Sequence, residues 1–281
     1  EFGNFKGSCR ALQRDNPGKQ FWRKRRQSIH RNIAFGRLTD MITKISSIIT
    51  LLFLVTLEYV QAQDFVYPTI IKEGLKVKEF IPYGWKIRDS VSGDLNNDRT
   101  NDIAVILQYK DTVTILNPDE YDPDTIHIQP RILLILFLDK RTHKFQFVEQ
   151  NNTFILRNDD PTLLDDPYQS ITITKGVLSV EFQLSYGIGS WNITHSSYSF
   201  RYQNNDFVLV SAYKNMFNRA THNYENYSFD FLQKQWKLTK GNDDTDQLPE
   251  TETLHLDVNE LKTLKTLKAP YTWELVKDVF L

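Results

Sequence analysis

Oxygen-bearing side chains recur at every second position between Asp94 and Asp102, and this pattern carries the clearest chemistry in the chain. The stretch reads Asp94-Leu-Asn-Asn-Asp-Arg-Thr-Asn-Asp102. Ca²⁺ takes six to eight oxygen ligands, and loops with alternating oxygen donors wrap such an ion. Asp94, Asn96, Asp98 and Asp102 would supply side-chain oxygens, and Thr100 would supply its backbone carbonyl. The pattern therefore predicts Ca²⁺ as a cofactor of this loop, bound by these five residues.

The loop resembles the Asp-x-[Asp/Asn]-x-Asp-Gly-x-x-Asp loops of FG-GAP/VCBS-type repeats and of dockerins. It departs from them at the sixth position, where Arg99 replaces the usual Gly. A residue other than Gly at positive φ is costly, and the Arg charge would lie beside the ion. The same residues also suit an Asn/Asp-rich turn that caps a strand without any metal. The sequence leaves both interpretations open.

A wider set of segments also resembles a known group of proteins. These segments are Ile81–Asn96, Pro130–Phe137, Asp166–Tyr168, Gly189–Trp191 and Tyr198–Asn204. Together they resemble a family of uncharacterised secreted or periplasmic proteins of Bacteroidetes-type bacteria. The resemblance covers most of the chain after residue 62. It implies a fold and a compartment, but no activity and no catalytic residues.

Residues 41–62 have the three parts of a secretory signal peptide. Lys44 is the positive charge, Ile48–Leu57 is a short apolar run, and Val60-Gln-Ala62 is a small-residue cleavage site. The apolar run is shorter than the roughly 20 residues that a membrane span needs. We therefore expect a secreted or periplasmic protein with no membrane span in its mature part. Residues 1–40 are then a non-native or upstream segment, expected to be disordered, and residues 63–281 form one mainly β domain.

The charge balance of the mature part excludes one class of partner. The chain has 34 basic and 35 acidic residues; 11 of the basic and four of the acidic ones precede residue 63, which leaves 23 against 31 and a net charge of −8. An acidic surface repels phosphate backbones, so we expect no nucleic-acid partner. The only cysteine, Cys9, lies before the signal peptide, so a thiolate zinc site is excluded from the mature part.

Short runs with strand-like patterns dominate residues 63–281. Buried or alternating runs are Ile103–Leu107, Arg131–Leu138, Lys144–Glu149, Ile171–Thr174, Val177–Leu184, Tyr198–Tyr202, Phe207–Ser211, Tyr227–Leu232 and Gln235–Leu238. Turn residues such as Gly176 join consecutive runs into hairpins. The pattern predicts a mainly β fold with little helix: a single antiparallel meander, a curved sheet or an open barrel. Leucines spaced by three residues suggest one helix over Val258–Leu267.

Residues for catalysis are few. Asp165, Asp166 and Glu181 could act as paired carboxylates for glycoside hydrolysis, but nothing in the sequence sets their separation. The histidines are scattered without metal-ligand spacing.

An aromatic and glycine-rich connection offers a second kind of site. Its aromatic residues Tyr186, Trp191 and Tyr198 would contact a ligand if exposed, or pack in the core at a sheet corner. Two functions follow. The first is a non-catalytic binding or structural module, stabilised by calcium, whose partner is an unknown protein or glycan of the cell envelope. The alternative is an envelope glycan hydrolase.

Overall fold

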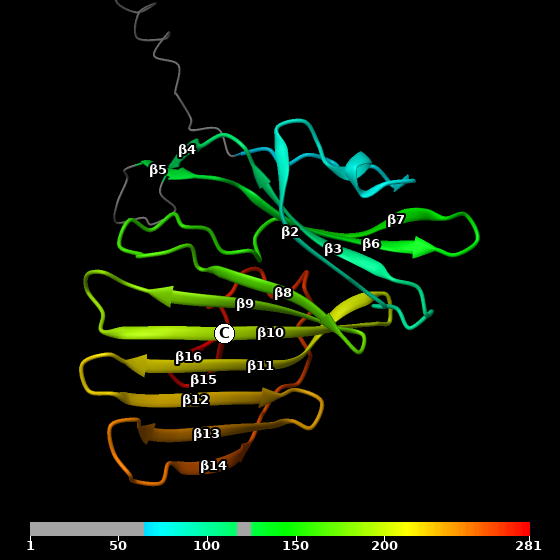
Figure 1. The fold of residues 1–281 in the computed structure, drawn as a ribbon. Helices are drawn as coiled ribbons and strands as arrows, with labels where there is room; N and C mark the ends of the chain where they lie inside the picture. The colour runs from blue at the N-terminus through cyan, green and yellow to red at the C-terminus, as the bar shows by residue number, and fades with distance from the viewer. Residues whose placement is uncertain (1–64, 117–124) are drawn as a thin grey trace, which may run out of the picture. The chain divides into compact units, whose positions relative to one another are not determined.

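The structure is a computed structural model, and it describes residues 65–116 and 125–281. These residues belong to one compact unit, Ala62–Leu281 (Figure 1). The predictions for the upstream segment and the signal peptide therefore lie outside the described residues.

The prediction of a mainly β, antiparallel fold is confirmed. The described strands form two larger open sheets and two small hairpins, and the helical content is one short 3₁₀ helix, η1 (Val77–Phe80). The five-stranded sheet has the order β1 (Glu73–Gly74), β7 (Lys144–Asn151), β6 (Arg131–Asp139), β3 (Asp102–Tyr109), β2 (Trp85–Gly93). No helix within the described residues is long and apolar enough to cross a membrane.

The seven-stranded sheet is an antiparallel meander of strands that follow one another in the chain. Its order is β14 (Glu250–His255), β13 (Gln235–Asn242), β12 (Asn223–Asp230), β11 (Asp206–Asn218), β10 (Asn192–Gln203), β9 (Val177–Ser185), β8 (Tyr168–Thr174). The small hairpins are β4 (Val113–Leu116) with β5 (Thr125–Ile128), and β15 (Glu274–Val276) with β16 (Val279–Phe280).

The central strands β3 and β6 are continuous apolar runs because both faces of their sheet are covered. Side chains that alternate along a strand point to opposite faces. Ala104 and Ile106 pack in a core shared with the seven-stranded sheet, whereas Val105 and Leu107 pack in a second core. That second core includes Phe80 and other residues N-terminal to β2. Each fully buried Ile, Leu or Phe contributes about 1.5–3 kcal/mol.

The predicted hairpins are present, and their turns have the expected backbone. In the β8–β9 turn, Lys175 and Gly176 have φ of 52° and 76°. Asn204 and Asn205 take the same left-handed conformation between β10 and β11. Two consecutive positive φ values match the right-handed twist of a two-residue hairpin.

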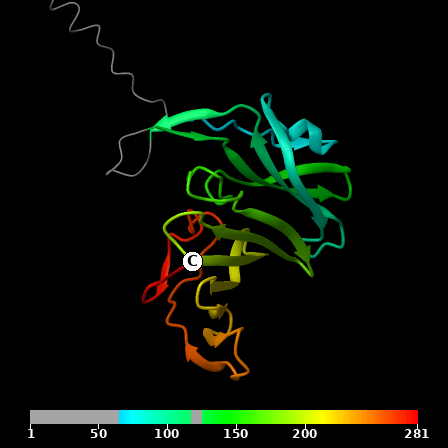
Figure 2. The same cartoon turned by 60° about the vertical axis from the view of Figure 1, so that its left-hand side comes forward.

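The predicted helix over Val258–Leu267 is wrong. Within that segment the backbone is extended or turned, and it follows one face of the seven-stranded sheet (Figures 1 and 2). The Leu264 N–H donates to the Phe207 carbonyl (2.8 Å), and the Leu209 N–H donates to the Lys262 carbonyl (2.8 Å). Leu264 and Leu267 are buried in the shared core. Their spacing of three residues therefore reflects a turn that places both side chains on the sheet.

Candidate functional site

The predicted calcium loop joins β2 to β3, and its side-chain oxygens hold its own backbone. The Asp94 carboxylate accepts hydrogen bonds from the N–H groups of Asp98 (3.2 Å) and Arg99 (2.8 Å). Asn96 Oδ1 accepts one from the Asp98 N–H (2.9 Å), and Asp98 Oδ1 accepts one from the Thr100 N–H (2.7 Å). The loop therefore closes around Asp94, Asn96 and Asp98.

Arg99 takes the backbone conformation that a glycine would take at this position. Its φ is 66°, and Asn97 has φ of 63°. Asn tolerates the left-handed region, but a residue with a longer side chain occupies it at a cost of roughly 1–2 kcal/mol. Arg99 therefore adds strain to the loop at the position where the FG-GAP-like pattern has Gly.

Asp102 connects the loop to the neighbouring strand. It is fully buried, and its carboxylate accepts hydrogen bonds from the N–H groups of Leu95 (2.9 Å) and Leu138 (3.1 Å). Burial raises the pKa of Asp102, and the backbone hydrogen bonds oppose this shift. Leu95 is itself fully buried in the shared core. The loop is therefore part of the fold and not a surface appendage.

The donor chemistry of the loop fits a hard cation, although its carboxylates are spread out. All five predicted ligand groups are oxygens, and Thr100 Oγ1 is a buried atom without a hydrogen-bond partner among residues 65–116 and 125–281. Within the described residues, however, Asp94, Asp98 and Asp102 do not bring one carboxylate oxygen each to within 4.8 Å of one another. The Lys140 ammonium donates to the Asp98 carbonyl (2.5 Å). Calcium binding by this loop stays a prediction.

The loop also touches the second sheet. A Cβ on Gly93 would lie 2.6 Å from Ile173 Cγ2, and a Cβ on Gly176 would lie 3.2 Å from Asn97 Oδ1. The end of β2 therefore packs against strand β8, and the loop that follows it packs against the β8–β9 turn, where the two sheets meet.

A cluster of two arginines and one aspartate lies elsewhere on the five-stranded sheet. Arg131 is only 4% exposed, and its guanidinium donates to both oxygens of Asp166, with 2.9 Å to Oδ1. Arg88 Nη2 lies 3.0 Å from Asp166 Oδ2. Burial raises the pKa of Asp166, but hydrogen bonds and charge from Arg131, with the charge of Arg88, outweigh it and lower the pKa overall. Asp166 is therefore ionised near neutral pH.

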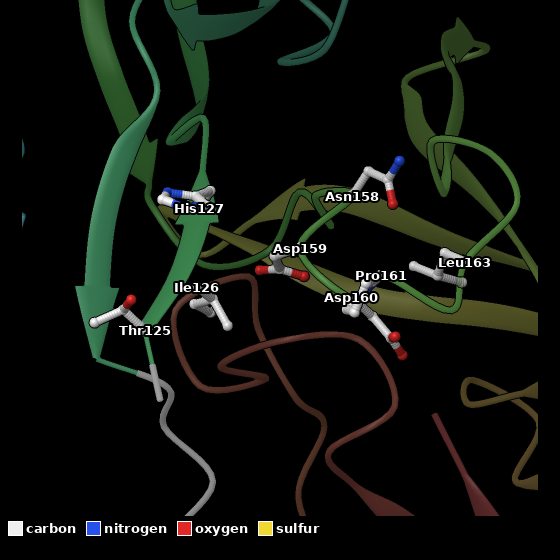
Figure 3. A pocket seen from close by; sticks show the side chains of 8 residues that line it. All are labelled: Thr125, Ile126, His127, Asn158, Asp159, Asp160, Pro161 and Leu163. Atoms are coloured by element: carbon white, nitrogen blue, oxygen red, sulfur yellow. The ribbon is translucent and has the colours of Figure 1, made fainter. Parts of the chain in front are cut away.

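A groove of about 420 Å³ lies beside this cluster, between β5 and the loop that precedes β8 (Figure 3). One wall carries Thr125, Ile126 and His127, and the other carries the segment 158–163. An adjoining cavity of about 380 Å³ shares His127 and Asn158 and reaches Arg131 and Asp166. The lining is mixed, because it combines carboxylate, amide, hydroxyl and imidazole groups with aliphatic side chains.

Sequence reasoning missed this groove. Its two walls are about 30 residues apart in the chain, and neither wall has a local motif. The carboxylates of the loop wall are held in place. Asp159 Oδ2 accepts hydrogen bonds from the Arg157 guanidinium (2.9 and 3.1 Å), and Asp160 Oδ1 accepts from the Thr162 N–H (2.8 Å) and hydroxyl (2.6 Å).

The three aromatic residues predicted as ligand contacts differ in their exposure to solvent. Tyr198 is fully buried, with its ring edge-on to Phe154, so it belongs to the core and does not reach the surface. Trp191 is 65% exposed, and the Arg219 guanidinium lies 5.8 Å from the centre of its ring. Tyr186 is partly buried, and burial raises its pKa. Of the three, Trp191 offers an open aromatic face.

The carboxylates considered for hydrolysis differ in their surroundings. Asp165 is exposed, whereas Asp166 is held by its two arginines. Glu181 accepts a hydrogen bond from the Ser170 hydroxyl (3.0 Å) and lies 4.0 Å from His195.

Comparison with known proteins adds no family to this picture. A scan against protein-family models found no match, and searches of curated proteins and of solved structures found none either. The resemblance to FG-GAP-like loops and to a Bacteroidetes-type secreted family therefore stays a prediction.

Proposed function

We propose that this chain is a secreted or periplasmic, non-catalytic binding module that holds an envelope glycan in the groove between β5 and the segment 158–163. The observation that carries the proposal is the groove itself. Its volume of about 420 Å³ lies in the range of small-molecule sites, roughly 300–1,000 Å³. Its lining alternates polar groups such as His127 and Asn158 with aliphatic groups such as Ile126 and Leu163. A sugar ring presents hydroxyl groups and C–H faces, which suit such a lining.

Binding is favoured over catalysis because the carboxylates near the groove are already engaged. A glycosidase needs one carboxylic acid with a raised pKa to protonate the leaving group. The pKa of Asp166 is lowered by its arginines, and Asp159 is paired with Arg157. Groups that are fixed in this way orient a ligand through hydrogen bonds, and the lowered pKa makes Asp166 a poor proton donor.

In this proposal calcium stabilises the scaffold and does not contact the glycan. Asp94, Asn96, Asp98, the Thr100 carbonyl and Asp102 would hold the ion where β2 and β8 meet. Support comes from their oxygen-only chemistry and from the buried Thr100 hydroxyl, which has no hydrogen-bond partner in the described part of the chain. The strain at Arg99 and the Lys140 ammonium oppose tight binding, so we expect a dissociation constant of about 10⁻⁴–10⁻³ M, as in extracellular modules.

Ligand binding is tested by titrating soluble envelope glycan fragments into isotopically labelled protein and following amide shifts. Shifts should concentrate on residues 125–128 and 157–163, and His127→Ala should weaken binding, whereas Asp165→Asn should not. Shifts elsewhere, or equal affinity for the His127 variant, would contradict the groove assignment. Release of new reducing ends during the titration would instead support the alternative, an envelope glycan hydrolase.

Calcium binding is tested separately by thermal melting with millimolar calcium or with chelator. With about 1 mM calcium and a dissociation constant of about 10⁻⁴–10⁻³ M, the bound ion would stabilise the folded state by about 0.4–1.4 kcal/mol. Calcium should raise the melting midpoint of the wild type and leave that of Asp98→Ala unchanged. Asp165→Ala is the matched control and should respond like the wild type. Equal wild-type midpoints with calcium and with chelator would leave the loop as a turn without metal.

A further inference from the structure

His222, Asp243 and Asp244 lie at one end of the seven-stranded sheet, although 21 residues separate the histidine from the first aspartate. His222 precedes β12, and Asp243 follows β13. The register pairs Asn223 with Asn242, so the residues just outside this pair must meet. Figure 1 shows the β11–β12 and β13–β14 connections at the same end of the sheet. The Asp243 N–H donates to the His222 carbonyl (3.1 Å), which fixes the two segments against each other.

Two carboxylates converge on one imidazole nitrogen. His222 Nδ1 lies 3.0 Å from Asp243 Oδ1 and 3.3 Å from Asp244 Oδ1, and all three atoms lie within 4.8 Å of one another. Among the described residues this is the only His, Cys, Asp or Glu group of three that meets that condition. Ligands placed about 2.0–2.1 Å from a tetrahedral zinc ion are themselves about 3.3 Å apart. The two histidine–carboxylate separations are close to that value.

The surrounding hydrogen bonds hold the three residues in place without an ion. The His222 N–H donates to the Asn218 carbonyl (2.8 Å), and its ring lies edge-on to Phe217. Asn242 Nδ2 donates to the Thr221 carbonyl (2.7 Å), and Asn242 Oδ1 accepts from the Asp244 N–H (2.9 Å). Partners of this kind orient metal ligands before the ion arrives.

We propose that His222, Asp243 and Asp244 bind a divalent transition-metal ion of the zinc class. One imidazole nitrogen and two carboxylate oxygens suit Zn²⁺ better than Ca²⁺, which prefers oxygen donors. The His222 and Asp243 side chains are 40% and 53% exposed and that of Asp244 is 66% exposed, so water completes the coordination. A single imidazole N–H cannot satisfy two carboxylates fully, whereas an ion satisfies all three groups. The ion would tie the β11–β12 turn to the β13–β14 turn.

The competing explanation is an ordinary surface pair between a protonated histidine and two carboxylates. The surface ion pair and the metal site predict different behaviour toward added ions. A surface pair needs only the proton, and it gives no selectivity among divalent ions. A metal site binds one zinc ion per chain through all three side chains, and it gives cobalt the absorption spectrum of a coordinated ion.

The experiment is calorimetric titration of Zn²⁺ into the full chain near neutral pH, repeated with Ca²⁺ and with Co²⁺ by absorption. We expect one zinc ion per chain at this site, at least tenfold weaker binding for His222→Ala and for Asp243→Asn/Asp244→Asn, and no competition from Ca²⁺. His195→Ala is the matched control, because His195 pairs with one carboxylate, that of Glu181 at 4.0 Å, and belongs to no group of three ligands within the described residues. It should bind zinc like the wild type.

Circular dichroism of the variants in chelator checks that they remain folded; the conservative double Asn variant keeps the size of both side chains. The proposal is overturned if His222→Ala binds zinc with unchanged affinity and stoichiometry, or if the wild type shows no zinc binding. It is also overturned if His195→Ala loses as much affinity as His222→Ala.

Discussion

Replacing Asp166 with Asn should be among the most damaging single changes to the stability of this domain. Arg131 is 4% exposed and would keep its charge while losing its anionic partner. Removing one partner of a buried ion pair costs about 3–5 kcal/mol. The Asp166 side chain is 30% exposed, and Asn keeps one acceptor oxygen, so we expect about 2–4 kcal/mol. For a domain of this size that lowers the melting midpoint by roughly 5–15 °C.

The assay is thermal or urea unfolding of Asp166→Asn beside Asp165→Asn. Asp165 is the neighbouring residue and is exposed, so its change should stay within about 0.5 kcal/mol of the wild type. Comparing the two variants therefore separates the loss of the ion pair from a general effect of removing negative charge. Equal stability of the two variants would refute the view that the Arg131–Asp166 cluster holds this part of the sheet.

The same cluster sets a pH dependence with a definite sign. The pKa of Asp166 is lowered in the folded protein, so its contribution is fully present above the ordinary value of 3.8 and is lost as pH falls through the folded pKa. The stability gap between wild type and Asp166→Asn should therefore be constant near neutral pH and shrink below about pH 4. A gap that is unchanged at pH 3 would contradict the ionised pair.

Three further changes test the loop between β2 and β3, each by thermal unfolding. Arg99→Gly should raise the midpoint above that of Arg99→Ala, since relief of about 1–2 kcal/mol of left-handed strain exceeds the roughly 0.5–1 kcal/mol entropy cost of Gly. Gly93→Ala should cost about 1–3 kcal/mol by overpacking against Ile173, and Ile173→Ala should remove most of that penalty. Leu95→Ala should cost about 2–5 kcal/mol, because Leu95 is fully buried; a value under 1 kcal/mol would mean that the loop is not part of the core.

Local patterns in the sequence were sufficient to predict the hairpins. Lys175-Gly176 between two alternating runs predicts a two-residue turn, and the backbone there has the two positive φ values that such a turn requires. The run Arg131–Leu138 predicts a strand with both faces covered, and its apolar residues do divide between two cores. In each case the cause lies within about ten residues, where periodicity and turn chemistry act.

The same reasoning failed where long-range packing decides the structure. Leucines at spacing three near Leu264 fit a helix as well as a turn that lies on a sheet, and only the position of β11 selects the turn. The groove beside His127 and the group around His222 join residues 21 or more positions apart. Their contacts depend on strand order and register, which no local pattern encodes.

The two candidate ion sites differ in what they connect, and this gives a way to tell them apart. The β2–β3 loop is joined to the five-stranded sheet, because the N–H groups of Leu95 in the loop and Leu138 in β6 both donate to the buried Asp102 carboxylate. The His222 group connects two exposed turns.

By mass action either ion raises the global melting midpoint. Amide exchange is more selective, because an amide gains protection only if its opening disrupts the bound site. Calcium should therefore slow exchange at Leu95 and Leu138, whereas zinc should slow exchange at Asp243 and Asp244, whose local openings disrupt its site. Protection of Leu138 by zinc without protection of Asp243 and Asp244 would mean that zinc binds at the β2–β3 loop, against both assignments.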